Sequence, residues 1–345
     1  MNPKGSPLSF QKNHPLAPYT TLRIGGPAEF FLHTHSSQEL VQALKYALKN
    51  KLSPTILGNG SNVLISDSGL SGLVIKNSST NIKLLSKKPV SPSSSPKTIP
   101  TYRSEPEAKK YLDFSSLDYD ESKLPQTTIK VDSGTSLQHL IAWTFNQSLT
   151  GLQWFAGIPG TVGAAVYCNI HGGSYHFSDY LKEIEVFNLK TKKTQTLKKE
   201  ELNFDYDQSL LQKKPELIIL SATLCLFQGD VPKAQAIYAT WTSQKNKVQP
   251  QNSAGCTFKN VLSPQKAKSL NFDSPSTSWV IDHVLKLKGK KEGGAQISHQ
   301  HANFIVNTGN ATAKDYLKLA ALVQKKFKAK TGLDLEIEVK VLKNT

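Results

Sequence analysis

GIPGTVGAA, residues 157–165, is a glycine-punctuated segment that leads into the apolar run AAVY. Pro159 fixes the chain direction, and Gly160 and Gly163 would let the N-terminus of a short helix open toward a pyrophosphate. A second glycine turn, GNGSN at residues 58–62, lies between two apolar runs, where its N–H groups can face phosphate oxygens. Alone, GNGSN favours a plain tight turn. Two such loops in one chain predict a dinucleotide site.

Helical and strand patterns alternate on both sides of these loops. Helical spacing of apolar residues predicts helices at 37–49 and 137–146, and short apolar runs predict strands within 21–32, 128–131, 183–188 and 217–227. Near the C-terminus, Thr312 and Asp315 form a capping signal, and helical spacing continues to a stop at Gly332. With no repeat period visible, this order predicts an α+β or α/β architecture.

The closing stretch LEIEVKVL, residues 335–342, alternates strictly between apolar and polar side chains. That period predicts one strand whose polar face carries Glu336, Glu338 and Lys340 together. On that face Glu336 would raise the pKa of Glu338 and make it useful as an acid. The alternative is a solvated strand carboxylate, which is the usual fate of such a residue.

Residues 86–126 are rich in Ser, Pro and Lys. Their apolar content is too small to offset the entropy of ordering them, so we expect a largely mobile surface insertion that interrupts a domain.

The chain of 345 residues carries a formal net charge of +16, which would attract nucleic acid, anionic lipid or a nucleotide diphosphate. No RNP pattern, helix-turn-helix or finger spacing is present, which favours solubility and ligand steering as the reason for the charge. A basic nucleic-acid-binding protein remains the alternative from a different class of protein.

No stretch approaches the length of a membrane span, and the N-terminus lacks the apolar region of a secretory signal, so we expect a cytoplasmic protein. Cys168, Cys225 and Cys256 are an odd set without a CxxC pair, which predicts reduced thiols and no zinc site. The histidines of SHQHANF, residues 298–304, lack an obvious third ligand, so no metal is predicted there either.

NSAGCTFKN, residues 252–260, places a thiol, an ammonium group and an amide in one short segment. These groups can donate a proton and bind an anion. A buried structural cysteine is the equally weighted alternative.

Six segments, in order along nearly the whole chain, resemble the UDP-N-acetylenolpyruvoylglucosamine reductase family (MurB): TTLRIGGPAEFF, LGNGSNVLISDSGLSGLVI, GLQWFAGIPGTVGAAVYCNIHGG, NSAGCTFKN, IDHVLKLKGKKEGGAQISHQHANFIVN and LEIEVKV. The short linkage after HANFIVN looks like the form that lacks an extra tyrosine loop (type II). The resemblance implies an α+β architecture: an FAD-binding fold of the vanillyl-alcohol-oxidase (PCMH) type in two subdomains, 1–80 and 127–235, separated by the insertion at 81–126. A C-terminal α+β substrate domain at 236–330 and a strand at 331–345 that returns to the active site would complete it.

The resemblance also implies the reaction. NADPH would reduce FAD, hydride would pass from the flavin to C3 of the enolpyruvyl group of UDP-N-acetylglucosamine enolpyruvate, and an acid would protonate C2. The product, UDP-N-acetylmuramate, is a peptidoglycan precursor, and the enzyme would serve cell-wall synthesis and cell division as a monomer. Another FAD-dependent oxidoreductase of the same fold is the alternative within enzymes.

Family positions carry over residue by residue. The residues implied for FAD binding are Gly58, Asn59, Gly60, Ser61, Asn62, Ile158, Pro159, Gly160, Thr161, Gly163, Ala164 and Lys340. Those implied for the substrate are Tyr206, Lys259 and Asn260, with Glu338 assisting protonation.

Two positions depart from the family pattern. Cys256 stands where the family usually has the serine that protonates C2, and a thiol of pKa about 8.5 remains a competent acid. Asp207, in NFDYDQSLLQ, stands where the block F-x-Y-R-x-S has an arginine that stabilises the anionic intermediate. This exchange should weaken transition-state stabilisation, unless Lys213, Lys214 or another nearby base supplies the charge.

Overall fold

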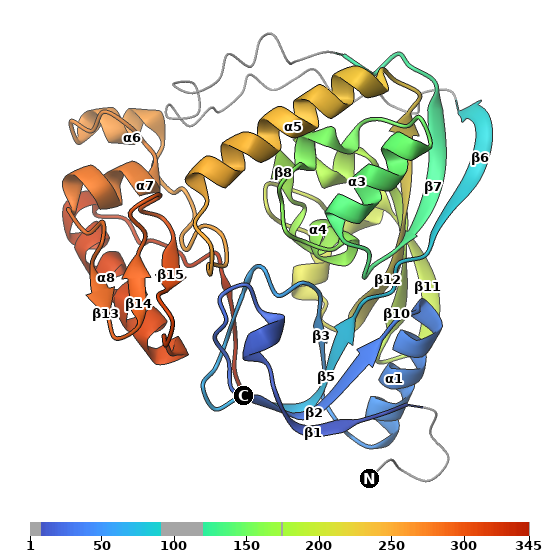
Figure 1. Cartoon of the computed structure of the whole chain (residues 1–345), viewed down its shortest axis with the longest axis horizontal. Coiled ribbons are helices and arrows are strands. Elements are labelled where there is room, and N and C mark those ends of the chain that lie inside the picture. The colour runs from blue at the N-terminus through green and yellow to red at the C-terminus, as the bar shows by residue number, and fades with distance from the viewer. Residues whose placement is uncertain (1–7, 91–119, 174, 345) are drawn as a thin grey trace.

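The computed structural model describes residues 8–90, 120–173 and 175–344. A four-stranded sheet near the N-terminus has the order β1 (Gln11–Pro15), β2 (Pro27–Thr34), β5 (Leu70–Asn77), β3 (Pro54–Leu57). β1 is antiparallel to β2, whereas β2 and β3 run parallel to β5. Helix α1 (Ser37–Lys49) lies beside this sheet at the bottom of Figure 1.

The predicted helix at 37–49 is confirmed as α1. Ser36 caps it by accepting a hydrogen bond from the backbone N–H of Glu39, as an N-cap serine does. Its apolar face packs on the four-stranded sheet and also reaches the next sheet through the buried side chains Leu40, Ala43, Leu44, Ala47, Leu32, Leu73, Ile75, Phe187 and Leu220. One apolar core therefore joins the two sheets.

The second sheet is five-stranded and antiparallel, in the order β11 (Lys193–Lys198), β10 (Leu181–Asn188), β12 (Leu217–Phe227), β7 (Gln126–Asp132), β6 (Ile82–Val90). Helices α3 (Leu137–Asn146), α4 (Val162–Cys168) and α5 (Val231–Val248) accompany it (Figure 1). The short strands β8 (His171–Gly172) and β9 (Tyr175–His176) form a hairpin directly after α4. 3-10 turns lie at Ala17–Tyr19, Leu152–Phe155, Phe177–Asp179, Lys199–Leu202 and Leu210–Lys213.

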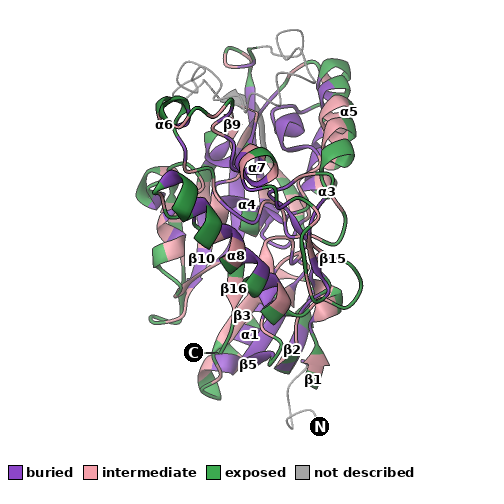
Figure 2. Ribbon diagram, turned by 90° about the vertical axis from the view of Figure 1, so that its left-hand side faces the viewer, coloured by how far each residue is buried: buried purple, intermediate pink, exposed green. Residues whose placement is uncertain are grey.

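The C-terminal unit, residues 249–337, contains the sheet β13 (Lys291–Glu292), β14 (Ala295–Ile297), β15 (Ile305–Asn307). Its helices are α6 (Pro264–Ser269), α7 (Thr277–Trp279), which continues into a π-helical turn at Val280–Val284, and α8 (Ala313–Thr331). α8 confirms the predicted helix, with a capping box of Thr312 and Asp315 and a left-handed Gly332 at its end. In Figure 2 it carries purple and green stripes, as an amphipathic helix should.

Two boundaries differ from the sequence-based expectation. Residues 82–90 belong to β6, which pairs with β7, although they were assigned to the mobile insertion. At its other end, Glu121 is buried and accepts hydrogen bonds from Thr150 and Gln153. The remainder of that insertion, residues 91–119, lies outside the described residues. α5 spans the expected boundary at 235, and Ile237 packs into the core of the five-stranded sheet.

The single strand predicted for 335–342 is wrong. Ile337 forms only an isolated bridge with Phe258 of the C-terminal unit, whereas β16 (Lys340–Leu342) pairs parallel with β4 (Val63–Ile65). Between Ile337 and Lys340 the chain changes its pairing partner from Phe258 to β4. The alternation of apolar and polar residues in the sequence does not show this change. Glu338 lies at this crossing. In the described parts of the chain, no helix has the length and apolarity needed to cross a bilayer.

Candidate active site

A cavity of about 870 Å³ opens where the two glycine turns meet residues 249–255 and the C-terminal crossing. This volume falls within the range of roughly 300–1,000 Å³ typical of ligand pockets. Arg23, before β2, and the segment after α5 contribute further walls. The cavity therefore draws on all three parts of the fold.

The two glycine turns form one continuous wall. The side-chain amide of Asn59 donates to the carbonyl of Gly160 at 3.2 Å. A Cβ on Gly58 would come within 2.8 Å of Thr161 Oγ1, so only glycine allows this close approach. Among the described residues, none accepts a hydrogen bond from the backbone N–H of Ser61 or Asn62, both of which line the cavity. Those two donors suit phosphate oxygens.

The N-terminus of α4 does not face a ligand as predicted. Val162 N–H donates to the carbonyl of Thr135 at 2.9 Å, and Gly163 N–H donates to that of Ser133 at 2.8 Å. Ala164 N–H donates to the hydroxyl of Thr161. The chain itself uses these donors, so the expectation that they open toward a pyrophosphate is wrong.

The residues predicted for the cofactor divide into a lining set and a supporting set. Those that line the cavity are Ser61, Asn62, Ile158, Pro159, Gly160, Ala164 and Lys340. Outside the lining are Gly58, Asn59, Gly60, Thr161 and Gly163. Gly60 has a φ of +62°, and a Cβ there would lie 2.1 Å from the carbonyl of Tyr19, so its need for glycine comes from backbone packing.

The segment 252–260 is fixed by an amide from the HANF block. Asn303 is buried; its side-chain oxygen accepts from Phe258 N–H at 3.1 Å, and its side-chain nitrogen donates to the carbonyl of Phe258 at 2.8 Å. Thr257 N–H also donates to the backbone carbonyl of Asn303 at 2.6 Å. Asn303 therefore sets the position of Cys256, which is half-buried beside the lining residue Gly255 without itself lining the cavity.

Asn303→Ala should lower the free energy of unfolding by about 2–3 kcal/mol, because it leaves the buried N–H and C=O of Phe258 without partners. Urea unfolding followed by tryptophan fluorescence measures this difference. Asn50→Ala, which removes an exposed bond to Tyr46, is the matched control and should cost less than about 0.5 kcal/mol. If Asn303→Ala lowered the free energy of unfolding by a similarly small amount, Asn303 would not be what fixes segment 252–260.

Glu338 lines the cavity. Its backbone N–H donates to the carbonyl of Thr257 at 2.8 Å, which fixes it beside the segment that carries Cys256. Burial raises the pKa of Glu338 to about 7, and the nearby Asp207 adds to the rise, while His171, Lys259 and Lys340 oppose it. A carboxyl group with such a pKa exchanges protons readily near neutrality.

Glu336 does not raise the pKa of Glu338, contrary to expectation. Its side chain is 66% exposed and forms an ion pair with Lys259, with Nζ and Oε2 2.6 Å apart. That hydrogen bond and charge lower the pKa of Glu336 itself. The two carboxylates separate because the chain is not a regular strand here.

The remaining predicted residues lie at different depths. Lys259 and Asp207 line the cavity, whereas Tyr206 and Asn260 do not. Tyr206 is 57% exposed and stacks on the ring of His171 at 4.9 Å between centroids. Asn260 accepts a hydrogen bond from Thr277 N–H at 2.9 Å, which caps the start of α7.

Five lysine or arginine side chains line the cavity against two carboxylates, Asp207 and Glu338. The cations are Arg23, Lys213, Lys245, Lys259 and Lys340. Such a surplus of positive charge favours a ligand with several phosphate groups.

This arrangement can be compared with known proteins. The chain is 31% identical over 334 residues to the UDP-N-acetylenolpyruvoylglucosamine reductase of Clostridium botulinum (strain Alaska E43 / Type E3), covering 96% of this chain and 92% of that protein. The chain belongs to the UDP-N-acetylenolpyruvoylglucosamine reductase family. The reductase of Lactobacillus delbrueckii subsp. bulgaricus is 33% identical over 98% of this chain and 97% of that protein. The profile of the family's C-terminal domain matches residues 247–342.

A solved structure agrees with the sequence relatives. The UDP-N-acetylenolpyruvylglucosamine reductase (MurB) of Thermus caldophilus superposes with a TM-score of 0.69 at 28% identity, covering 97% of this chain and 99% of that one. The family resemblance and the α+β FAD-binding fold are thereby confirmed. The assignment to the form without the tyrosine loop stays a prediction.

The cavity of this reductase fits FAD on its own geometry. Ser61 and Asn62 offer unpaired N–H groups within the described structure, and a Cβ on Gly160 would meet only Leu137 at 3.6 Å. Backbone and cations can therefore approach a pyrophosphate together.

Lys245, Cys168 and His171 are among the cavity residues that were not predicted for the site from the sequence. Lys245, from α5, donates to the carbonyl of Ala156 at 2.8 Å, and burial lowers its pKa to about 8. Burial raises the pKa of the Cys168 thiol to about 11. His171 forms an ion pair with Asp207. Cys168 and His171 fall inside the quoted block GLQWFAGIPGTVGAAVYCNIHGG, but the block alone assigned them no role.

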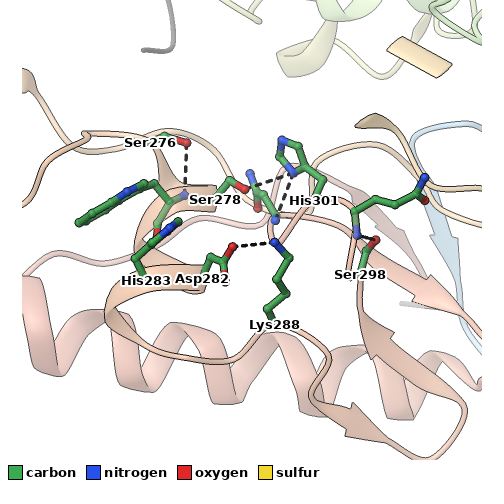
Figure 3. Close-up of polar contacts among 10 residues, drawn as sticks. Ser276, Ser278, Asp282, His283, Lys288, Ser298 and His301 are labelled. Atoms are coloured by element: carbon green, nitrogen blue, oxygen red, sulfur yellow. Dashed lines mark hydrogen bonds and ion pairs between the residues drawn. The ribbon is translucent and has the colours of Figure 1, made fainter. Parts of the chain in front are cut away.

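The histidines of SHQHANF make contacts within the C-terminal unit of the reductase. His301 Nδ1 lies 3.4 Å from the hydroxyl of Ser278 and 3.3 Å from Asn303 N–H (Figure 3). Figure 3 also shows Lys288 turned toward Asp282, 2.7 Å away. His301 thus supports the loop that carries Asn303.

Proposed function

We propose that FAD lies along the wall made by the two glycine turns, and that the UDP-sugar lies between this wall and residues 252–260. The chain is an FAD-dependent reductase that uses NADPH to convert UDP-N-acetylglucosamine enolpyruvate to UDP-N-acetylmuramate in peptidoglycan synthesis. The observation that carries the arrangement is Glu338, which lines one cavity together with residues of both glycine turns and is bonded through its backbone N–H to Thr257 of the Cys256 segment.

Each part of the chain would have a distinct task. Ser61 and Asn62 would bind the flavin pyrophosphate through backbone N–H groups, with Lys340 beside them. Lys259 would bind an anionic group of the substrate, and its ion pair with Glu336 would fix its position. When bound, FAD supplies the hydride chemistry, whereas the protein supplies positions and charges.

Proton delivery would come from the Cys256 and Glu338 side of the cavity. Glu338 is poised to hold and release a proton near neutrality. Cys256 is kept beside it by the backbone bond between Glu338 and Thr257. We propose that the thiol protonates C2 and that Glu338 assists this step and polarises the substrate carboxylate.

We also infer that the enzyme works in the cytoplasm as a monomer. No disulfide joins its three cysteines in the described structure, which suits a reducing compartment. Size-exclusion chromatography with light scattering would test the oligomeric state.

Purified protein should be yellow and should oxidise NADPH at a rate that depends on the enolpyruvyl UDP-sugar. Its visible absorption spectrum reports bound flavin, and mass spectrometry of the product reports UDP-N-acetylmuramate. Aldonolactones and small hydroxy acids serve as control substrates and should give no turnover. Colourless protein from flavin-replete cells, or turnover of a control substrate instead, would contradict this assignment.

A further inference from the structure

His171 and Asp207 form an ion pair at the wall of the cavity. His171 Nδ1 lies 3.1 Å from Asp207 Oδ1, and both residues line the cavity with Glu338. An ionised carboxylate only accepts hydrogen bonds, so Nδ1 must carry the proton that joins them. In the described part of the chain, the structure gives Nε2 of His171 no partner. Nε2 is therefore the nitrogen that can meet a ligand.

Backbone contacts on both sides hold this pair in place. His171 begins β8 and pairs with His176 of β9. Asp207 adopts a left-handed φ of +51°, and its carbonyl accepts from the side chain of Gln212 at 2.9 Å. A left-handed backbone at a non-glycine residue is uncommon and persists where its surroundings fix it. The ring of His171 also stacks on Tyr206.

The charges around His171 favour its protonated form. Partial burial lowers its pKa, but the hydrogen bond and charge of Asp207 and the charge of Glu338 raise it more, and Lys245 opposes them; the net direction is upward. Two further titratable rings lie close to His171: Tyr206 at 4.9 Å and His176 at 6.3 Å between centroids. The side chain keeps 42% of its surface exposed, which it presents at a cavity wall.

The substrate makes a cation necessary at this place. Hydride addition at C3 places an electron pair on C2 that delocalises into the adjacent carboxylate, until a proton from an acid group forms the C2–H bond. That charge would develop beside Asp207 and Glu338, two groups that repel it when ionised. The position of Asp207 is also where the resemblance places an arginine. A nearby cation would offset both carboxylates.

We propose that His171 is a catalytic residue of this reductase: its imidazolium, oriented by Asp207, binds the carboxylate of the enolpyruvyl group and stabilises the charge that hydride addition creates there. Asp207 is then a positioning residue that acts through His171. Lys213, one of the bases named from the sequence as candidates to supply the charge, also lines the cavity, but among the described residues no carboxylate forms an ion pair with it. This inference rests on the proposed function.

The test measures the two half-reactions by stopped flow in the wild-type enzyme and in His171→Gln. Reduction of the bound flavin by NADPH should be unchanged, whereas its reoxidation by the UDP-sugar should slow by about 10²-fold, the usual loss of one anion-stabilising donor. His171→Lys should recover part of this rate because it keeps the charge. His176→Gln, on the same hairpin but outside the cavity lining, should stay within about 3-fold of wild type, and Lys213→Gln should slow reoxidation less than His171→Gln does.

Asp207→Asn supplies a readout independent of folding at position 171. Without the carboxylate, the pKa of His171 should fall, so its NMR titration should move to lower pH. Asp207 also raises the pKa of Glu338, so the alkaline limb of reoxidation is compared in the Glu338→Gln background, where removal of Asp207 should move it to lower pH as well. The groups that face His171 and remain in Asp207→Asn are Glu338, Lys245, His176 and Tyr206.

The measured reoxidation rates distinguish a failure of the proposed function from a failure of the role of His171. A wild-type enzyme that does not reoxidise with the UDP-sugar overturns the proposed function. A wild-type enzyme that does, combined with His171→Gln at an unchanged rate or Lys213→Gln with the larger loss, overturns the role of His171 alone. An ion pair with a purely structural role would leave the rate of reoxidation and its pH profile unchanged when either partner is replaced.

Discussion

Glu338→Gln should slow the reoxidation of reduced enzyme by substrate by about 10²–10⁴-fold, the usual contribution of a positioned acid–base group. The amide keeps the size of the side chain and its backbone bond to Thr257, but it removes the exchangeable proton. Flavin content and the rate of reduction by NADPH should not change. Stopped-flow absorbance separates these rates. Glu336→Gln, two residues away with its side chain at the surface, should stay within about 3-fold of wild type.

The role of Glu338 also predicts how the rate of reoxidation depends on pH. Because the pKa of Glu338 is raised to about 7, its protonated form dominates at lower pH and is lost as the pH rises through that value. Reoxidation should therefore decline on the alkaline side. In Glu338→Gln this component should disappear, and the limb that remains should belong to His171. Unchanged rates and an unchanged profile in Glu338→Gln would exclude Glu338 from protonation.

Cys256→Ala should leave reduction of the flavin by NADPH intact and slow its reoxidation by substrate by about 10²-fold or more, because no acid remains at this position. Cys256→Ser should retain much of the activity, since a hydroxyl can also donate a proton from the same place. The serine variant also controls for packing, because it nearly preserves the volume of the side chain. Both half-reactions are measured by single-turnover absorbance.

Cys225 is the matched control for Cys256, because it is also half-buried and also absent from the cavity lining. Cys225 lies in β12 and does not line the cavity, so Cys225→Ala should reoxidise at the wild-type rate. Wild-type reoxidation in Cys256→Ala would remove the proton-donor role and leave Glu338 as the acid. That result would be consistent with the half-buried position of Cys256 just behind Gly255.

Apolar periodicity predicted α1, and periodicity together with a capping signal predicted α8, since each helix has a regular apolar face. The strand β6 escaped prediction because its second half, SKKPV, belongs to a stretch rich in Ser, Pro and Lys, while its place in the sheet comes from pairing with β7. The alternation of residues 335–342 was read as one strand because the sequence does not record a change of pairing partner. Tertiary context decides both cases.

The candidate site was found largely through the glycine turns and the family blocks. Their contact through Asn59 and Gly160, residues far apart in sequence, explains why two loops were needed to suggest one ligand. Sequence alone misplaced the N–H groups of α4, because it did not show that Ser133 and Thr135 accept from them. His171 lies in one of these blocks, but its pairing with Asp207, 36 residues further along the chain, could not be seen from the sequence.

The crossing at Glu338 has a mechanical consequence. The C-terminal unit is tied to the rest of the enzyme by two covalent connections, one leaving α5 and the other ending in β16, which is anchored on β4. Leu22 and Ile24 add a third anchorage by packing inside that unit's core. A body held at several points swings about a fixed hinge line rather than rotating freely. Since Glu338 lies on one tether, any such swing that admits or releases the sugar would also displace the proton-handling group.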